Sequence, residues 1–274
     1  EEGVGQGISL IIFGGIVAGI LPSLGQMMTL DNTARIFSIA TFLIYLVLTV
    51  LVIVIVQEGQ RRIAVQYGRR VRGRKIYQGQ STHIPLKVNT AGMIPIIFAQ
   101  SILTFFPLIA GLFMTGSGSF VDRFANTISQ FGTNQDPTIA PVAFAAYWIL
   151  YFILVVAFTF FYTDVMIRQQ NLPETLQRQG GFIPGIRPGK RTETYITSVV
   201  RRITLIGALF LGIIAVMPGI MAVIAVILQI DGLEQSVLVI SGSGLIIVVG
   251  VVIDTMRQLE AQLLMRHYEG FIKS

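Results

Sequence analysis

The stretch IFSIATFLIYLVLTVLVIVIV, residues 36–56, contains no charged side chain, and its most polar members are serine, threonine and tyrosine. About 20 helical residues cross a hydrocarbon core roughly 30 Å thick, so this stretch predicts a membrane-spanning segment. Backbone groups in lipid must be satisfied within the segment, which favours a helix. Comparable apolar stretches occupy about 8–24, 91–114, 139–162, 203–228 and 236–253. The sequence therefore predicts an all-α multi-pass membrane protein with six transmembrane helices.

The composition of the whole chain indicates that lipid is its main solvent. Of its 274 residues, 53% are hydrophobic and only 12% are charged, which lies outside the usual range of soluble domains. There is no cysteine, and the histidines are His83 and His267, so neither a disulfide framework nor a cysteine or histidine metal cluster is expected. We predict no catalytic residue, no metal and no cofactor.

The basic residues are distributed very unevenly between the predicted spans. Of the 20 Lys and Arg residues, 18 lie in loops 57–90 and 163–202 or in the C-terminal tail, leaving Arg35 and Arg123 for the alternate loops. Short loops rich in Lys and Arg stay on the cytoplasmic side of a membrane. The two large loops and both ends of the chain are therefore predicted to be cytoplasmic.

Loop 57–90 shows the pattern of a small β-hairpin. Apolar and other residues alternate from Ile63 to Tyr67, a basic turn containing glycine follows, and a second extended stretch runs from Ile76 to Val88. Its charge could simply fix the topology or touch anionic lipid. It could equally contact a polyanionic partner such as ribosomal RNA.

Loop 163–202 is rich in proline and glycine, a composition that predicts turns and not a long helix. Within it, Arg187-Pro188-Gly189 suits a tight turn with proline second and glycine third. Arg187 is then expected at an exposed tip. It is either an ordinary solvated arginine or a side chain presented to a partner.

The predicted span 91–114 combines proline with uncharged polar side chains. Pro95 and Pro107 are expected to interrupt it, and Gln100, Ser101 and Thr104 lie between them. Such features can serve close packing and kinking, or they can mark a moving or pore-facing helix.

The side chains within the predicted spans also favour some classes of membrane protein over others. The lack of ionisable residues there disfavours a secondary transporter, which couples ions near the midplane. An intramembrane protease needs a catalytic pair within the spans, and none is present. A structural membrane scaffold remains an alternative.

Five strings of the sequence are distinctive: GISLIIFGGIVAG (7–19), EGQRRIAVQY (58–67), QSTHIPLKVNTAGMIPIIFA (80–99), GGFIPGIRPG (180–189) and GLIIVVGVVID (244–254). Together they resemble the bacterial SecY family and occur in the order found in that family. The resemblance implies ten transmembrane helices in two pseudo-symmetric halves, of which this chain supplies helices five to ten in a single membrane-embedded domain, 1–274. Residues 1–35 are then the last helix of the N-terminal half and a hinge, and 36–274 are the C-terminal half. Because the chain begins at Glu1, we expect it to be processed or a fragment.

The resemblance implies a pore-forming subunit of a protein-conducting channel in the bacterial plasma (inner) membrane. Such a channel passes unfolded secretory polypeptides and releases transmembrane segments laterally into lipid. Its implied partners are SecE, SecG, the motor ATPase SecA, the ribosome, the nascent or precursor polypeptide and membrane lipid.

The resemblance also assigns roles to individual residues. The implied pore ring is Ile12, Ile16, Ile97 and Ile247. The implied lateral gate contains Pro95, Gln100, Ser101 and Thr104. The implied ribosome contacts are Arg61, Arg62, Arg69 and Arg70, and Arg187 is the implied contact for SecA and the ribosome.

Overall fold

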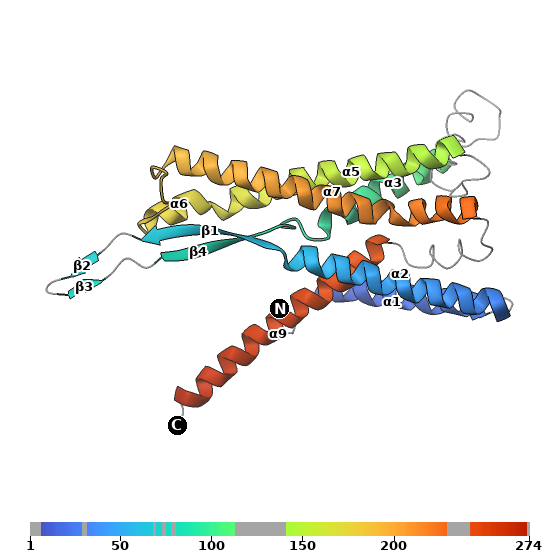
Figure 1. Ribbon diagram of the computed structural model, residues 1–274, viewed down its shortest axis with the longest axis horizontal. Helices are drawn as coiled ribbons and strands as arrows, with labels where there is room; N and C mark the ends of the chain where they lie inside the picture. Colours follow the sequence, from blue (N-terminus) through green and yellow to red (C-terminus); the bar gives the residue numbers. More distant parts are fainter. Residues whose placement is uncertain are drawn as a thin grey trace. The chain divides into compact units, whose positions relative to one another are not determined.

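The computed structural model describes residues 7–28, 32–67, 70–72, 75–77, 81–112, 141–228 and 242–272. A long helix coincides with each predicted apolar stretch, in whole or in part (Figure 1). Arg69 and the span portions 113–114, 139–140 and 236–241 lie outside the described residues. The long helices are α1 (Gly7–Met28), α2 (Asn32–Glu58), α3 (Ile94–Leu112), α5 (Pro141–Gln170), α7 (Lys190–Leu228) and α9 (Gly242–Ile272), and a short α6 (Leu172–Arg178) follows α5.

Within the described residues, three helical segments are long and apolar enough to cross a membrane. These segments are Ile94–Leu112, Pro141–Arg178 and Lys190–Ile224, and shorter apolar helices cover Leu10–Gly19 and Phe42–Glu58. The membrane-spanning character of the chain is thus confirmed, while the count of six spans stays a prediction.

The hairpin predicted in loop 57–90 is present as two paired strands. Strand β1 (Gln60–Tyr67) pairs antiparallel with β4 (Ser81–Lys87), with Ile63 opposite Ile84. The short strands β2 (Arg70–Arg72) and β3 (Lys75–Tyr77) form a second antiparallel pair between them. The alternation of the sequence is repeated in the burial of β1, since Ile63 and Val65 are buried and Ala64 is exposed.

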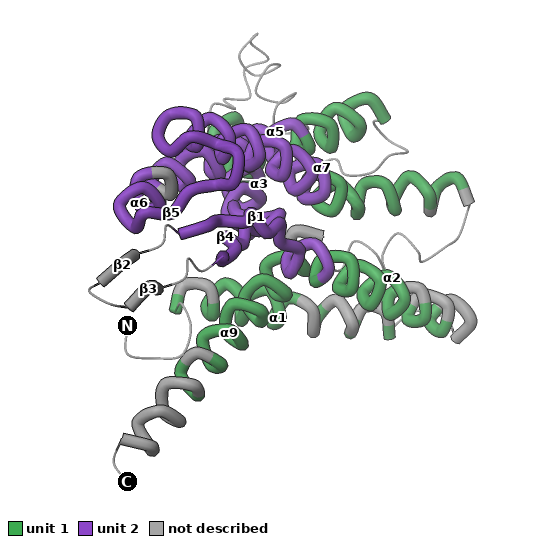
Figure 2. The backbone as a smooth tube through the Cα atoms, turned by 60° about the vertical axis from the view of Figure 1, so that its left-hand side comes forward, with its two compact units in different colours: residues 1–54, 100–152, 213–274 green, residues 55–99, 153–212 purple. Residues whose placement is uncertain are grey.

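The chain divides into two compact units (Figure 2). Unit 1 comprises residues 1–54, 100–152 and 213–274, and unit 2 comprises 55–99 and 153–212. In unit 1 large hydrophobic side chains stay exposed, as at Leu112 and Val142, which are 80% and 81% exposed. Exposed apolar helix faces suit a surface that lipid covers.

Unit 2 has a buried hydrophobic core built from both predicted cytoplasmic loops. Residues of β1 pack there with residues of α6, of the segment after it and of α7. Apolar burial of this kind is the main stabilising contribution to a small folded region in water. The buried members of this core, called here the sheet core, are Ile63, Val65, Leu176, Ile183, Ile196, Val199, Val200 and Ile203.

The prediction of turns rather than a long helix in loop 163–202 was wrong for most of that loop. Helix α5 continues to Gln170, and α7 already begins at Lys190. Hydropathy marks where a helix becomes polar, not where its backbone hydrogen bonds stop. Exposed pairs such as Asp164 with Arg168, spaced i,i+4 and 2.8 Å apart, suit the polar extension. Turns remain at Asn171, between α5 and α6, and around residues 179–189.

Candidate functional site

The first candidate region is the exposed surface of strand β1. Arg61 and Arg62 are both exposed and lie opposite Leu86 and Pro85 of β4. Strand pairing holds the backbone of both arginines, while the buried side chains of the same strand anchor it to the sheet core. The predicted ribosome contacts Arg61 and Arg62 are thereby presented on an ordered strand. Arg70 lies in β2.

A third strand, which the sequence did not predict, joins the two basic loops. Strand β5 (Gly181–Phe182) pairs antiparallel with the end of β1, placing Gly181 opposite Tyr67. A side chain at position 181 would lie 3.1 Å from the Tyr67 ring and 3.2 Å from Val65 Cγ1, so glycine permits this close approach. The regions around Arg61 and Arg187 therefore belong to one folded unit.

The turn that carries Arg187 is held from both sides. Gly185 and Gly189 adopt φ values of 82° and 110°, a region that favours glycine. The buried hydroxyl of Thr192 donates to the Arg187 carbonyl at 3.1 Å, and the Gly189 carbonyl accepts from the first turn of α7. Arg187 itself is exposed, as predicted.

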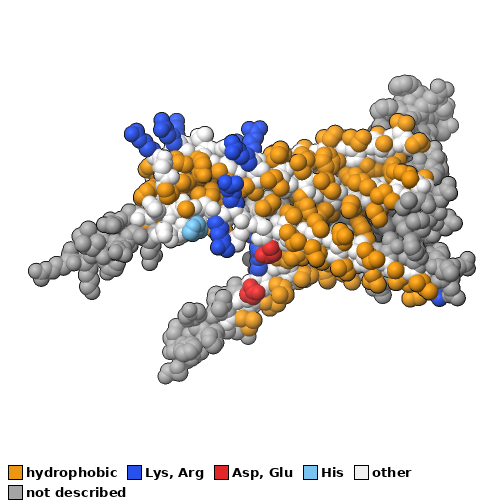
Figure 3. All heavy atoms as spheres, viewed as in Figure 1, with side chains coloured by type: hydrophobic (Ala, Val, Ile, Leu, Met, Phe, Trp, Pro, Cys, Tyr) orange, Lys and Arg blue, Asp and Glu red, His pale blue; other side chains and the backbone are white. Residues whose placement is uncertain are grey.

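The surface of unit 2 carries several exposed basic side chains. Arg168 and Arg178 each have an i,i+4 carboxylate partner, at 2.8 and 3.6 Å. By contrast, Arg61, Arg62 and Arg187 form no ion pair with another described residue. Figure 3 shows Lys and Arg side chains gathered over elements of unit 2. Because few carboxylates lie among them, this surface attracts a polyanion.

A hydrogen-bonded turn connects β4 to helix α3. The side chain of buried Asn89 accepts from the Gly92 N–H at 3.0 Å and donates to the Gly92 carbonyl at 3.1 Å. The Val88 N–H donates to the Gly59 carbonyl at 2.9 Å. On the other side, a Cβ at Gly207 of α7 would lie 2.6 Å from the Val88 carbonyl oxygen. The turn therefore lies between Gly59, which directly precedes β1, and Gly207 of α7.

Sequence analysis did not single out Asn89, Gly207 or Gly181 as functional residues. A signal existed for Asn89, because an Asn-x-x-Gly string before an apolar run is typical of a turn. Nothing in the sequence shows that Gly207 approaches Val88, since the two residues are far apart in the chain.

Helix α3 carries three of the four predicted gate residues on one face. Gln100, Ser101 and Thr104 are exposed, and their spacing from Ile97 follows the i, i+3, i+4, i+7 pattern of a single stripe. The Thr104 hydroxyl donates to the Gln100 carbonyl at 2.9 Å. The expected interruption at Pro95 was wrong, because Pro95 is the second residue of α3, where a missing N–H costs no helical bond. Pro107 does lie inside the helix.

Three residues of the predicted pore ring lie on α1 and α9 of unit 1. Ile12 and Ile16 are four apart on α1, which places them on one face, and both are half-buried. A Cβ at Gly244 of α9 would lie 3.3 Å from Ile16 Cγ2, so the two helices meet closely there. Ile247, one turn further along α9, is buried. Ile97 is half-buried near the start of α3 and belongs to unit 2.

The side chains that the structure describes offer no metal centre. No group of three His, Asp or Glu in the described ranges could hold a metal ion. His83 is exposed on β4, opposite Ala64.

These features define a helical membrane protein with a small basic sheet folded from the segments between its long helices. The model of the SecY family matches residues 1–256, and the chain belongs to the SecY family.

The curated relatives agree with this assignment. The chain is 43% identical over 279 residues to the protein translocase subunit SecY of Halalkalibacterium halodurans, covering 99% of this chain and 60% of that protein. It is also 43% identical over 277 residues to the SecY subunit of Mycobacterium leprae, covering 100% and 59%. The chain thus spans about 60% of the length of the curated relatives it matches.

The fold is also shared with a solved structure described as "The structure of a protein conducting channel". The TM-score is 0.56 at 18% sequence identity, and the match covers 94% of this chain and 59% of the other. At this identity the likeness concerns the fold alone.

Proposed function

We propose that this chain is the C-terminal part of the pore-forming subunit of a protein-conducting channel. The observation that carries the proposal is the SecY family match over residues 1–256. The channel passes unfolded secretory polypeptides across the membrane and releases transmembrane segments into lipid. No covalent chemistry is part of this function.

The proposed topology has six spans, with both ends of the chain and the two basic loops in the cytoplasm. Helices at all six apolar stretches and the concentration of Lys and Arg in two loops support it. In the complete protein these would be helices five to ten of a ten-helix pseudo-symmetric channel in the bacterial plasma membrane. Residues 1–35 then end the N-terminal half, and 36–274 form the C-terminal half.

The proposed seal is a narrow apolar ring that excludes ions by dewetting. A channel for chains of any sequence cannot use a selective polar filter, so large aliphatic side chains suit this task. The meeting of α1 and α9 near Ile16 supports a ring containing Ile12, Ile16 and Ile247. Ile97 joins it from α3, whose polar stripe of Gln100, Ser101 and Thr104 supports the proposed lateral gate. Pro95 is the second residue of that helix.

The proposed docking surface lies on unit 2. Arg61, Arg62, Arg69 and Arg70 contact ribosomal RNA, and Arg187 contacts the motor ATPase SecA and the ribosome. The exposure of Arg61, Arg62 and Arg187 supports these roles. SecE and SecG are the proposed membrane partners.

Site-specific photocrosslinking in the full-length protein tests the pore directly. A photoreactive side chain replaces Ile16, and a secretory precursor is stalled during transport through native membranes. We expect a precursor crosslink at Ile16 and none at Ile44, an α2 residue whose side chain is 67% exposed. Equal capture at the two positions would place the polypeptide outside the proposed pore.

A further inference from the structure

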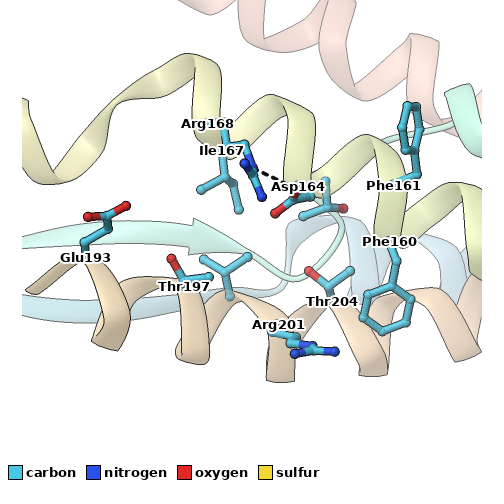
Figure 4. Close-up of a pocket in the computed structure, with 11 residues that line it drawn as sticks. Phe160, Phe161, Asp164, Ile167, Arg168, Glu193, Thr197, Arg201 and Thr204 are labelled. Carbon is cyan, nitrogen blue, oxygen red and sulfur yellow. Dashed lines mark hydrogen bonds and ion pairs between the residues drawn. The ribbon is translucent and has the colours of Figure 1, made fainter. Parts of the chain in front are cut away.

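A pocket of about 620 Å³ lies between the C-terminal part of α5 and the N-terminal part of α7, entirely within unit 2. Figure 4 shows Asp164, Ile167 and Arg168 of α5 facing Thr197 and Thr204 of α7 across it. This volume lies within the range of pockets that bind small molecules. None of its lining residues belongs to the proposed ring, gate or docking surface.

The pocket sits where both helices change from apolar to polar. The apolar stretch of α5 ends at residue 162, and that of α7 begins at residue 203. Phe160 and Phe161 line the apolar side, whereas Asp164 and Arg201 lie just beyond the two limits. A headgroup layer is about 5–7 Å thick, which corresponds to about four helical residues. Asp164 and Arg201 therefore lie at the level of phospholipid headgroups, whereas Arg168 and Glu193 lie further from the apolar stretches.

The charges of the pocket balance. Its ionisable lining residues are Asp164 and Glu193 against Arg168 and Arg201. The Asp164–Arg168 pair is 2.8 Å long, but its side chains are 55% and 80% exposed, so water competes with it and it can rearrange around a ligand. A purely anionic ligand would meet two carboxylates, whereas a ligand carrying both charges finds a partner for each.

The chemistry of these groups narrows the ligand further. Guanidinium groups bind phosphate through two parallel hydrogen bonds. Carboxylates bind a primary ammonium, which donates three hydrogen bonds, whereas a trimethylammonium group has no N–H to donate. Buried Thr163 and Thr204 add hydroxyl groups to the lining, and Phe161, which is 66% exposed, offers an apolar rim.

We propose that this pocket binds the headgroup of a phosphatidylethanolamine-type phospholipid, with phosphate on Arg201 and ammonium on Asp164. The proposal depends on the membrane placement of α5 and α7, and not on transport activity. The phosphate is bound as part of a lipid, since Phe160 and Phe161 continue the pocket toward the apolar part of the helices.

Native mass spectrometry of the purified full-length protein tests the proposal. The probes are dioleoyl phosphatidylethanolamine, phosphatidylcholine and phosphatidylglycerol, added separately at equal concentration. We expect the ethanolamine lipid to be retained about tenfold more than either of the others, because only it uses both charges through hydrogen bonds. Arg201→Gln should lower its retention about tenfold, and Asp164→Asn should shift the preference toward phosphatidylglycerol.

Arg202→Gln is the matched control, because Arg202 is also exposed on α7 but does not line the pocket. It should retain the ethanolamine lipid like the unmodified protein, and unchanged thermal unfolding of all variants confirms that they fold. Equal retention of the three lipids, or equal effects of Arg201→Gln and Arg202→Gln, would overturn the proposal. So would a photoreactive group at Thr197 that captures a protein segment in native membranes and no lipid.

Discussion

The two compact units bury their apolar side chains by different means. Unit 1 leaves residues such as Leu112 and Val142 about four-fifths exposed, whereas unit 2 encloses Val65 almost completely, at 1% exposure. The first pattern needs lipid to cover the apolar faces. The second pattern belongs to the part of unit 2 around the sheet core, which has a basic exterior, whereas the α5 and α7 residues of the same unit include exposed apolar side chains such as Phe161. A substitution at a covered position should therefore cost much more in unit 2 than one at an exposed position in unit 1.

The largest expected effect is at the centre of the sheet core. Val65→Asp places a charge among buried apolar side chains, which we expect to destabilise unit 2 by roughly 3–5 kcal/mol, as other uncompensated buried charges do. Gln66→Asp is the matched control, because it adds the same charge at the exposed neighbouring position. Limited proteolysis of the full-length protein should cut the loops of Val65→Asp much faster than those of the control. Equal cleavage would show that the sheet core does not hold unit 2 together.

A smaller effect is expected where α7 approaches the turn before α3. Gly207→Ala places a Cβ 2.6 Å from the Val88 carbonyl oxygen, so the turn must shift at a cost of about 1–3 kcal/mol. In Gly111→Ala, the new Cβ meets nothing within 4 Å, and removing the flexible glycine from a helix stabilises it slightly. The thermal unfolding midpoint of purified protein should therefore fall only for Gly207→Ala. If the unfolding midpoint fell for both variants, the loss of stability would come from replacing a helical glycine and not from displacing the turn before α3.

The parts of the fold that sequence predicted are those with a local pattern. Strand β1 was predictable because Ile63 and Val65 alternate with exposed neighbours, and the long helices because apolar stretches mark them. Strand β5 was not, since two residues have no periodicity and its partner Tyr67 lies more than a hundred positions earlier. The polar extension of α7 from Lys190 was missed because hydropathy indicates whether lipid or water surrounds a segment. It does not indicate whether the backbone is helical.

In the candidate site, too, features set by a local sequence pattern were predictable, and features set by contacts between distant residues were not. The exposure of Arg187 follows from its turn, whose glycines are visible in the sequence. The link between the Arg61 and Arg187 regions depends on β5, so the sequence presented them as two separate loops. The close approach of Ile16 to Gly244 likewise depends on how α1 packs on α9, which no local pattern specifies.

The smallest effects on folding stability are expected on the exterior of unit 2. Substitutions there should distinguish ribosome binding from SecA-driven export. Arg61→Glu with Arg62→Glu should weaken ribosome binding about tenfold or more at low salt, because phosphate contacts are replaced by repulsion. Arg187→Glu should chiefly abolish SecA-driven export of a precursor into vesicles. Both changes are at exposed positions and should leave the unfolding midpoint unaltered. Normal export by Arg187→Glu would remove that residue from the proposed motor contact.

Resting ion conductance tests the central claim, a pore sealed by aliphatic side chains, most directly. The full-length protein with Ile97→Asn and Ile247→Asn is compared in planar bilayers with Ile44→Asn, a change at a side chain 67% exposed on α2. Polar side chains wet an apolar constriction, so the double variant should show raised conductance without a substrate, and Ile44→Asn should not. Unchanged resting conductance in a stably assembled double variant would contradict the account.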